Sequence, residues 1–156
     1  MSKPLDTADP DVADGPTYWL VPAARSGAPD GDETLSRWLA RDRWGIRAGR
    51  SLRAGDWIAF YVSGVGVSAC ARVSADVTHP LTADDIPDGV KMDWNLWCVE
   101  LADAHRVIPP VQLTKELLVQ LDIVRGTRAL ANWGWLVQTK RRISEADFSR
   151  LTIAGL

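Results

Sequence analysis

Alternation of apolar and polar residues is clearest in one segment of this chain, and it predicts a β-strand there. Across residues 56–63, Ile58, Phe60 and Val62 fall on one side of an extended backbone and their neighbours on the other. The glycines of residues 64–66 are typical of a turn, so the following residues are expected to return as the second strand of a hairpin. We expect the three alternating apolar side chains to be buried together.

Similar patterns predict the other elements. Strands are expected at residues 18–21, 91–101 and 133–139, and helices at residues 33–43, 114–121 and from Ser144 onward. Thr114 and Ser144 are suitable N-caps for the last two helices. A mostly antiparallel set of strands with a few helices beside it predicts an α+β fold, a small barrel with flanking helices.

Composition fits a single folded unit. The chain has 156 residues, of which 46% are hydrophobic and 24% charged, so one ordinary core can form. Residues 1–15 are rich in aspartate and poor in apolar side chains, and we expect a disordered leader there and one domain at residues 16–156. The chain carries neither a signal-peptide pattern nor a membrane-length apolar run, which favours a cytoplasmic protein with no membrane partner.

Cysteine and histidine spacing gives no sign of a metal site. Cys70 and Cys98 lie in apolar, strand-like sequence and form no C-x-x-C pair. His79 and His105 lie far apart and have no ligand-spaced neighbours. We therefore expect two buried thiols, no bound metal and no cofactor.

Basic residues are concentrated in two segments, although the net charge is only −2. Arg47 belongs to the first, residues 37–53, and the second, residues 125–142, contains Arg128, Arg141 and Arg142. If the fold brings the segments together, they would form one phosphate-binding surface. The alternative is that both are ordinary solvated surface.

Tryptophan is unusually frequent, with eight in the chain against two Phe and two Tyr. Trp19 and Trp38 lie within apolar patterns and are expected in the core. Trp44 and Trp135 lie next to glycines and close to the basic segments. Aromatic residues interleaved with basic ones are typical of sites that stack bases and bind phosphates.

Several of these segments resemble EVE domains. Residues 18–21, Tyr-Trp-Leu-Val, resemble the opening Y-W-L of that family, and residues 55–63 resemble its G-D-x-x-x-F-Y-x-S strand. Residues 44–47, Trp-Gly-Ile-Arg, look like a shortened W-x-G-V-R-N segment, and residues 136–138 with the following helix are similar to the family's ending. The resemblance covers about residues 17–153.

The resemblance implies a PUA-like barrel related to the YTH readers of methylated adenine. It also implies a pocket that receives a modified base of DNA or RNA. The pocket residues would be Trp44, Tyr61, Ser63 and Trp135, and with the basic segments the phosphate-binding residues would be Arg47, Arg128, Arg141 and Arg142. The chain departs from the family at residues 22–25, which replace K-S-E-P, and at Ala48, which replaces Asn. The preferred base is therefore not transferred.

Two other classes of function compete with a reader. The related ASCH domains include nucleases with a G-x-K-x-x-E-x-R pattern, which this chain lacks, and no Ser-His-Asp or Cys-His pairing has sequence support. We therefore expect no enzymatic activity. A protein-interaction module would use its tryptophans as binding hot spots. Nucleic-acid binding differs from both in weakening steeply with salt.

Overall fold

A computed structural model describes residues 15–23, 31–47, 52–87, 96–125 and 134–153. Its strands are β2 (Tyr18–Pro22), β3 (Arg43–Ile46), β4 (Trp57–Val62), β5 (Gly66–Val73), β6 (Trp97–Val111) and β7 (Arg141–Ile143). Its helices are α1 (Gly31–Ala40), α2 (Lys115–Leu118), α3 (Glu145–Thr152) and the 3-10 turn η3 (Ala83–Asp85). The predicted leader lies, except for Gly15, outside the described residues.

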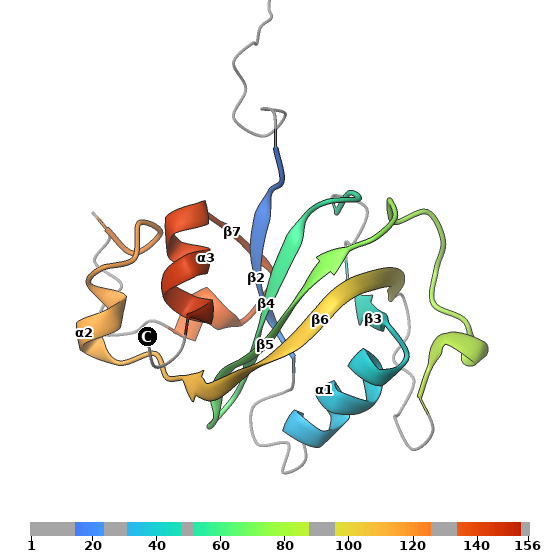
Figure 1. Ribbon diagram of the computed structural model, residues 1–156, viewed down its shortest axis with the longest axis horizontal. Coiled ribbons are helices and arrows are strands. Elements are labelled where there is room, and N and C mark those ends of the chain that lie inside the picture. Colours follow the sequence, from blue (N-terminus) through green and yellow to red (C-terminus); the bar gives the residue numbers. More distant parts are fainter. Residues whose placement is uncertain (1–14, 24–30, 48–51, 88–95, 126–133, 154–156) are drawn as a thin grey trace, which may run out of the picture.

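The strands form one six-stranded sheet in the order β3-β6-β5-β4-β2-β7 (Figure 1). Among the strands that the structure describes, β2 and β4 run parallel and the other neighbouring pairs are antiparallel. The predicted α+β class and the mostly antiparallel pairing are therefore confirmed. The described strands form an open half-barrel rather than a closed barrel, with β3 and β7 at its two edges.

The alternating apolar residues of β4 are buried on one face of the sheet. Ile58 and Phe60 are fully buried and Val62 is 2% exposed, so the three side chains share a core as predicted. Helix α1 covers this face at the β3 end and contributes Leu35 and Trp38 to the same cluster (Figure 1). We call this the α1 face.

The opposite face is covered by α2 and α3. Ala59, which alternates with Ile58 and Phe60, packs there with Leu20 and Leu151. The predicted N-caps are confirmed, because the Thr114 and Ser144 hydroxyls accept hydrogen bonds from the third residue of their helices. We call this the α3 face.

Three predicted elements differ from the structure. The strand expected at residues 91–101 is, over its described residues 97–101, the start of a longer strand, β6, that continues to Val111. No strand was expected at Arg43–Ile46, which form strand β3. Residues 134–137 form a 3-10 turn instead of a strand. A short run such as Trp135 to Val137 gives the same apolar pattern in either conformation, so tertiary packing decides.

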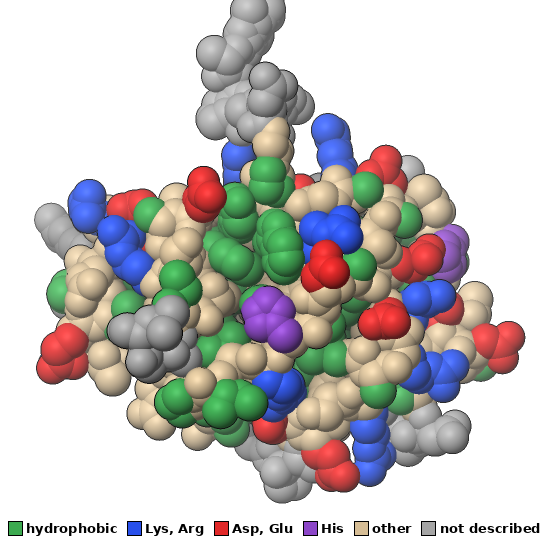
Figure 2. All heavy atoms as spheres, viewed as in Figure 1, with side chains coloured by type: hydrophobic (Ala, Val, Ile, Leu, Met, Phe, Trp, Pro, Cys, Tyr) green, Lys and Arg blue, Asp and Glu red, His purple; other side chains and the backbone are tan. Residues whose placement is uncertain are grey.

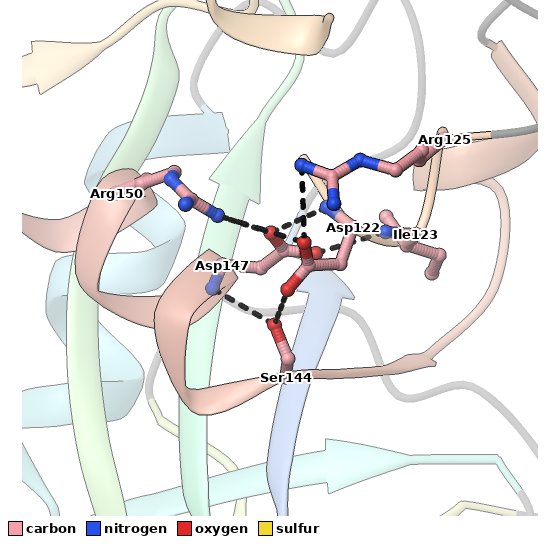
Figure 3. A network of polar contacts seen from close by, with 6 residues as sticks. All are labelled: Asp122, Ile123, Arg125, Ser144, Asp147 and Arg150. Carbon is pink, nitrogen blue, oxygen red and sulfur yellow. Dashed lines mark hydrogen bonds and ion pairs between the residues drawn. The ribbon is translucent and has the colours of Figure 1, made fainter. Parts of the chain in front are cut away.

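A buried carboxylate ties α3 to the loop after α2 (Figure 3). Asp147 is fully buried and accepts hydrogen bonds from the backbone N–H groups of Asp122 and Ile123, at 2.7 and 3.0 Å. Arg150 Nη1 lies 3.1 Å from the same carboxylate. The Asp147 backbone N–H also donates to the N-cap hydroxyl of Ser144 at 3.0 Å, so this residue joins the start of α3 to the loop after α2.

Within the described ranges, no helix is both long enough and apolar enough to cross a membrane.

Candidate nucleic-acid interface

The Asp of the G-D-x-x-x-F-Y-x-S segment has a structural role. Asp56 is 5% exposed and accepts hydrogen bonds from Thr17 N, Arg53 N and the indole Nε1 of Trp19, at 3.0, 3.0 and 3.3 Å. Gly55 precedes it with a φ of 95°, a conformation that favours glycine. The motif therefore fixes the start of β4 against β2.

Tyr61 and Trp135 lie on the α3 face and pack against the same hydrophobic cluster. Tyr61 is half-buried near the end of β4, where it pairs with Pro22 of β2. Trp135 is half-buried in the 3-10 turn before β7. Burial raises the pKa of Tyr61 above its usual value, so its phenol is neutral at pH 7.

Arg141 covers Trp135. Its Nε and Nη2 atoms donate to the Trp135 carbonyl oxygen at 3.2 and 3.0 Å, and its guanidinium carbon lies 5.4 Å from the indole centroid. Strand β7 sets this position, because Arg141 lies opposite Leu20 of β2. The result is a cation held against an aromatic ring by three contacts.

The indole N–H of Trp135 is buried and has no hydrogen-bond partner within the described part of the chain. An unsatisfied buried donor costs about 1–3 kcal/mol, so native proteins rarely keep one without a reason. A ligand with an acceptor atom would remove that cost. This donor is a polar feature of the α3 face that the sequence could not identify.

A second cation lies beside a second tryptophan at the same edge. Lys140 Nζ is 5.0 Å from the ring centroid of Trp19, and burial lowers the pKa of Lys140. Arg142 lies opposite Trp19 in the β2–β7 register. We call Trp19, Trp135, Lys140, Arg141 and Arg142 the β7 edge. Trp19 was expected only as a core residue, whereas the structure leaves it half-buried here.

Trp44 lies elsewhere. It is 6% exposed on the α1 face, with its ring centroid 5.7 Å from that of Trp38 and 5.0 Å from that of Phe60. Tyr61 follows Phe60 directly and packs on the opposite face, so the structure does not bring Trp44 beside Tyr61 and Trp135. The cause is the unpredicted strand β3, which directs alternate side chains into the core.

The other residues predicted for the base pocket and for phosphate binding also lie in different parts of the structure. Ser63 is half-buried just after β4, and Arg47 is exposed just after β3. Arg142 lies in β7, at the opposite edge of the sheet from β3. Arg128 lies outside the described residues. The strand order therefore places Arg142 and the β3 part of the first basic segment at opposite edges of the sheet. The same segment ends at Arg53, whose backbone N shares the Asp56 Oδ2 acceptor with Trp19 Nε1, so its last residue lies close to β2.

Arginines of the first segment make contacts with acidic groups. Arg37 pairs with Glu33 at 3.2 Å, and Arg43 lies 3.9 Å from Asp85 and 4.0 Å from Glu100. These partly exposed pairs contribute little stability, but they offset the positive charge of the segment. The β7 edge is a phosphate-binding candidate because Lys140 and Arg141 lie beside tryptophan rings there.

An aromatic group next to α3 was not singled out from the sequence. Phe148 has its ring centroid 5.0 Å from that of Tyr18 and 6.0 Å from that of Trp57. All three side chains are half-buried, and Figure 2 shows hydrophobic side chains gathered between α3 and the strands. Desolvation, with a smaller contribution from Glu145, raises the pKa of Tyr18. The sequence signal for this group was the position of Trp57, which precedes Ile58 in the alternating strand and therefore points to the opposite face of the sheet.

Comparison with known proteins gives a fold but no family. No family model matches the chain, and no curated protein matches it. Protein Atu2648 from Agrobacterium tumefaciens is similar in structure, with a TM-score of 0.54 and 20% identity over 90% of this chain and 94% of that one.

Two further solved structures are similar. Rpa0253 from Rhodopseudomonas palustris has a TM-score of 0.53 and 18% identity over 87% of this chain and 90% of that one. The MmI1 YTH domain has a TM-score of 0.47 and 11% identity over 87% and 92% of the two chains. The chain shares its fold with Atu2648 and Rpa0253.

Proposed function

We propose that this chain is a non-catalytic nucleic-acid reader of the EVE type, with a PUA-like fold, that binds a modified nucleobase beside Trp135. The observation that carries the proposal is the buried Trp135 indole N–H, which has no partner in the described ranges while Arg141 covers its ring. Every nucleobase has ring nitrogens or carbonyl oxygens that accept such a bond. The residue pattern resembling EVE domains points to the same class of ligand.

In this proposal the ligand is held by three kinds of contact. Trp135 donates to the base edge, and Tyr61 supplies an aromatic wall on the same face of the sheet. Ser63 hydrogen-bonds the base edge from the end of β4. Arg142 and Lys140 bind flanking phosphates at the β7 edge, where charge-assisted contacts position the strand without reading its sequence.

Burial disfavours the nucleophilic form of both thiols, including Cys70, whose Sγ lies 2.9 Å from His105 Nε2. Burial raises the pKa of Cys70 to about 11, and burial with a smaller effect of Asp85 raises that of Cys98 to about 11. A thiolate is the nucleophilic form, and at pH 7 both groups are almost fully protonated.

A protein-interaction module is the second candidate. The observation that favours it is the half-buried aromatic group of Tyr18, Trp57 and Phe148 beside α3. Clustered aromatic side chains of this kind are typical hot spots in protein interfaces. Binding through this group would depend little on salt, whereas phosphate contacts would make binding strongly salt-dependent.

We expect Arg142→Gln to weaken binding of single-stranded oligonucleotides and to reduce the salt slope of log K by about 0.7, the value of one phosphate contact. The measurement is a titration of methylated and plain DNA and RNA oligonucleotides at several salt concentrations, monitored by anisotropy. The matched control is Arg72→Gln, because Arg72 belongs to β5, which lies away from β7 in the strand order, and pairs with Asp103 at 2.9 Å. Equal slopes for the native protein and both variants would contradict a phosphate-binding β7 edge.

A further inference from the structure

Three side chains of types that can ligate a metal ion converge beside the α1 face, outside the proposed reader site. His79 comes from the loop after β5, Asp85 from the end of η3 and Cys98 from β6. Their ligand atoms all lie within 4.8 Å of one another. Sequence spacing did not predict this group, because the three residues are brought together only by the return of the chain from β5 to β6.

Backbone hydrogen bonds hold two of these residues in place. Cys98 N donates to the His79 carbonyl oxygen at 3.0 Å, and Leu81 N donates to the Leu96 carbonyl oxygen at 2.9 Å. An isolated β-bridge joins Pro80 and Trp97 between these bonds. The segment that carries His79 is therefore fixed alongside β6 before any ligand binds.

The carboxylate of Asp85 is also oriented. Both the backbone N–H and the hydroxyl of Thr82 donate to Asp85 Oδ2, each at 2.9 Å. Arg43 Nε lies 3.9 Å from Oδ1, a distance that leaves this oxygen able to accept a closer ligand. A carboxylate held through one oxygen presents the other in a fixed direction, as supporting residues do in metal sites.

We propose that His79, Asp85 and Cys98 bind one Zn²⁺-class transition-metal ion. An imidazole nitrogen, a thiolate sulfur and a carboxylate oxygen are ligand types that Zn²⁺ accepts together. Tetrahedral bonds of about 2.0–2.3 Å require the donor atoms to lie about 3.3–3.8 Å apart. The donor atoms lie within 4.8 Å of one another, so side-chain movements of about one ångström bring them to bonding positions. The ion takes the place of the Cys98 thiol proton, which is released to solvent on binding.

Charge supports a divalent ion at this position. The thiolate and the carboxylate together carry two negative charges, which balance Zn²⁺, and the imidazole binds in its neutral form. Arg43 then keeps its contact with Glu100 at 4.0 Å. The bound ion would join η3 and its loop to β6 and stabilise the folded chain by linkage.

The test is a titration of the full chain with Co²⁺ and Zn²⁺ under reducing conditions. Native protein is expected to bind one Co²⁺ with a near-ultraviolet thiolate-to-metal charge-transfer band and tetrahedral visible bands, to lose both on adding Zn²⁺, and to melt at a higher temperature with Zn²⁺. Cys98→Ser should abolish the charge-transfer band. The matched control is Cys70→Ser, because Cys70 Sγ is also close to a histidine, 2.9 Å from His105 Nε2.

Two further variants keep the test decisive if Cys98→Ser does not fold. Asp85→Asn retains the size of the side chain and should weaken Co²⁺ binding strongly, and Thr82→Ala should weaken it about 10–100-fold by releasing the carboxylate. Circular dichroism confirms folding of each variant. The proposal is overturned if native protein shows no charge-transfer band, if Cys70→Ser abolishes it, or if folded Asp85→Asn binds Co²⁺ as tightly as native protein.

Discussion

Replacement of Trp44 by alanine is expected to lower the free energy of unfolding by about 3–5 kcal/mol, as for other buried aromatic side chains. Trp44 packs between Trp38 and Phe60, with ring centroids 5.7 and 5.0 Å away, and its truncation leaves a cavity in the α1 face. A domain is stabilised by only about 5–15 kcal/mol in total, so this loss is a large share. Denaturant unfolding followed by circular dichroism measures it.

Trp57→Ala is the matched control for this prediction. Trp57 is also a strand tryptophan, but it is half-buried and lies on the α3 face. Its loss should cost clearly less than the loss of Trp44. If Trp44→Ala costs less than Trp57→Ala, or less than about 1 kcal/mol, Trp44 is not a core residue. Binding measurements on Trp44→Ala are informative only on protein shown to be folded.

Asp147→Ala is expected to cost about 2–4 kcal/mol, because two backbone N–H donors lose their acceptor at about 1–3 kcal/mol each. Its carboxylate is fully buried and accepts from Asp122 N at 2.7 Å, Ile123 N at 3.0 Å and Arg150 Nη1 at 3.1 Å (Figure 3). Truncation leaves two backbone donors and a cation without this acceptor. Thermal and denaturant unfolding measure the change.

Asp122→Asn tests the same network from its exposed side. The Asp122 carboxylate accepts from Ser144 Oγ at 2.8 Å but is 41% exposed, and its contacts with Arg125 and Arg150 are 3.7 and 3.9 Å long. Exposed ion pairs of this kind are worth about 0–1 kcal/mol. Comparable losses in Asp122→Asn and Asp147→Ala would refute the special role of the buried carboxylate.

Local pattern was sufficient to predict much of the fold. The buried set of Ile58, Phe60 and Val62 follows from a period of two, and the caps at Thr114 and Ser144 follow from hydroxyl chemistry within one helical turn. Strand β3 was missed because its four residues pair with distant residues of β6. A short strand of this kind depends on tertiary contacts more than on its own sequence.

The candidate site was less predictable because its contacts are long-range. Sequence could place Trp135 near basic residues, but not the covering of its ring by Arg141 or the unpaired indole N–H. The sequence could not show that Trp44 and Tyr61 lie on opposite faces of the sheet, because the position of Trp44 depends on how β3 joins the sheet. The cluster around Cys98 likewise depends on pairing between distant segments.

The most direct test of the reader proposal is the indole N–H region of the proton–nitrogen correlation NMR spectrum during titration with methylated and plain oligonucleotides. Trp135→Phe identifies the Trp135 signal among the eight tryptophans. We predict that this signal moves downfield as its N–H gains an acceptor, and that it saturates with the same Kd as binding, while the buried Trp44 signal changes little. An oligonucleotide that saturates the protein and leaves the Trp135 signal unmoved would contradict the proposal.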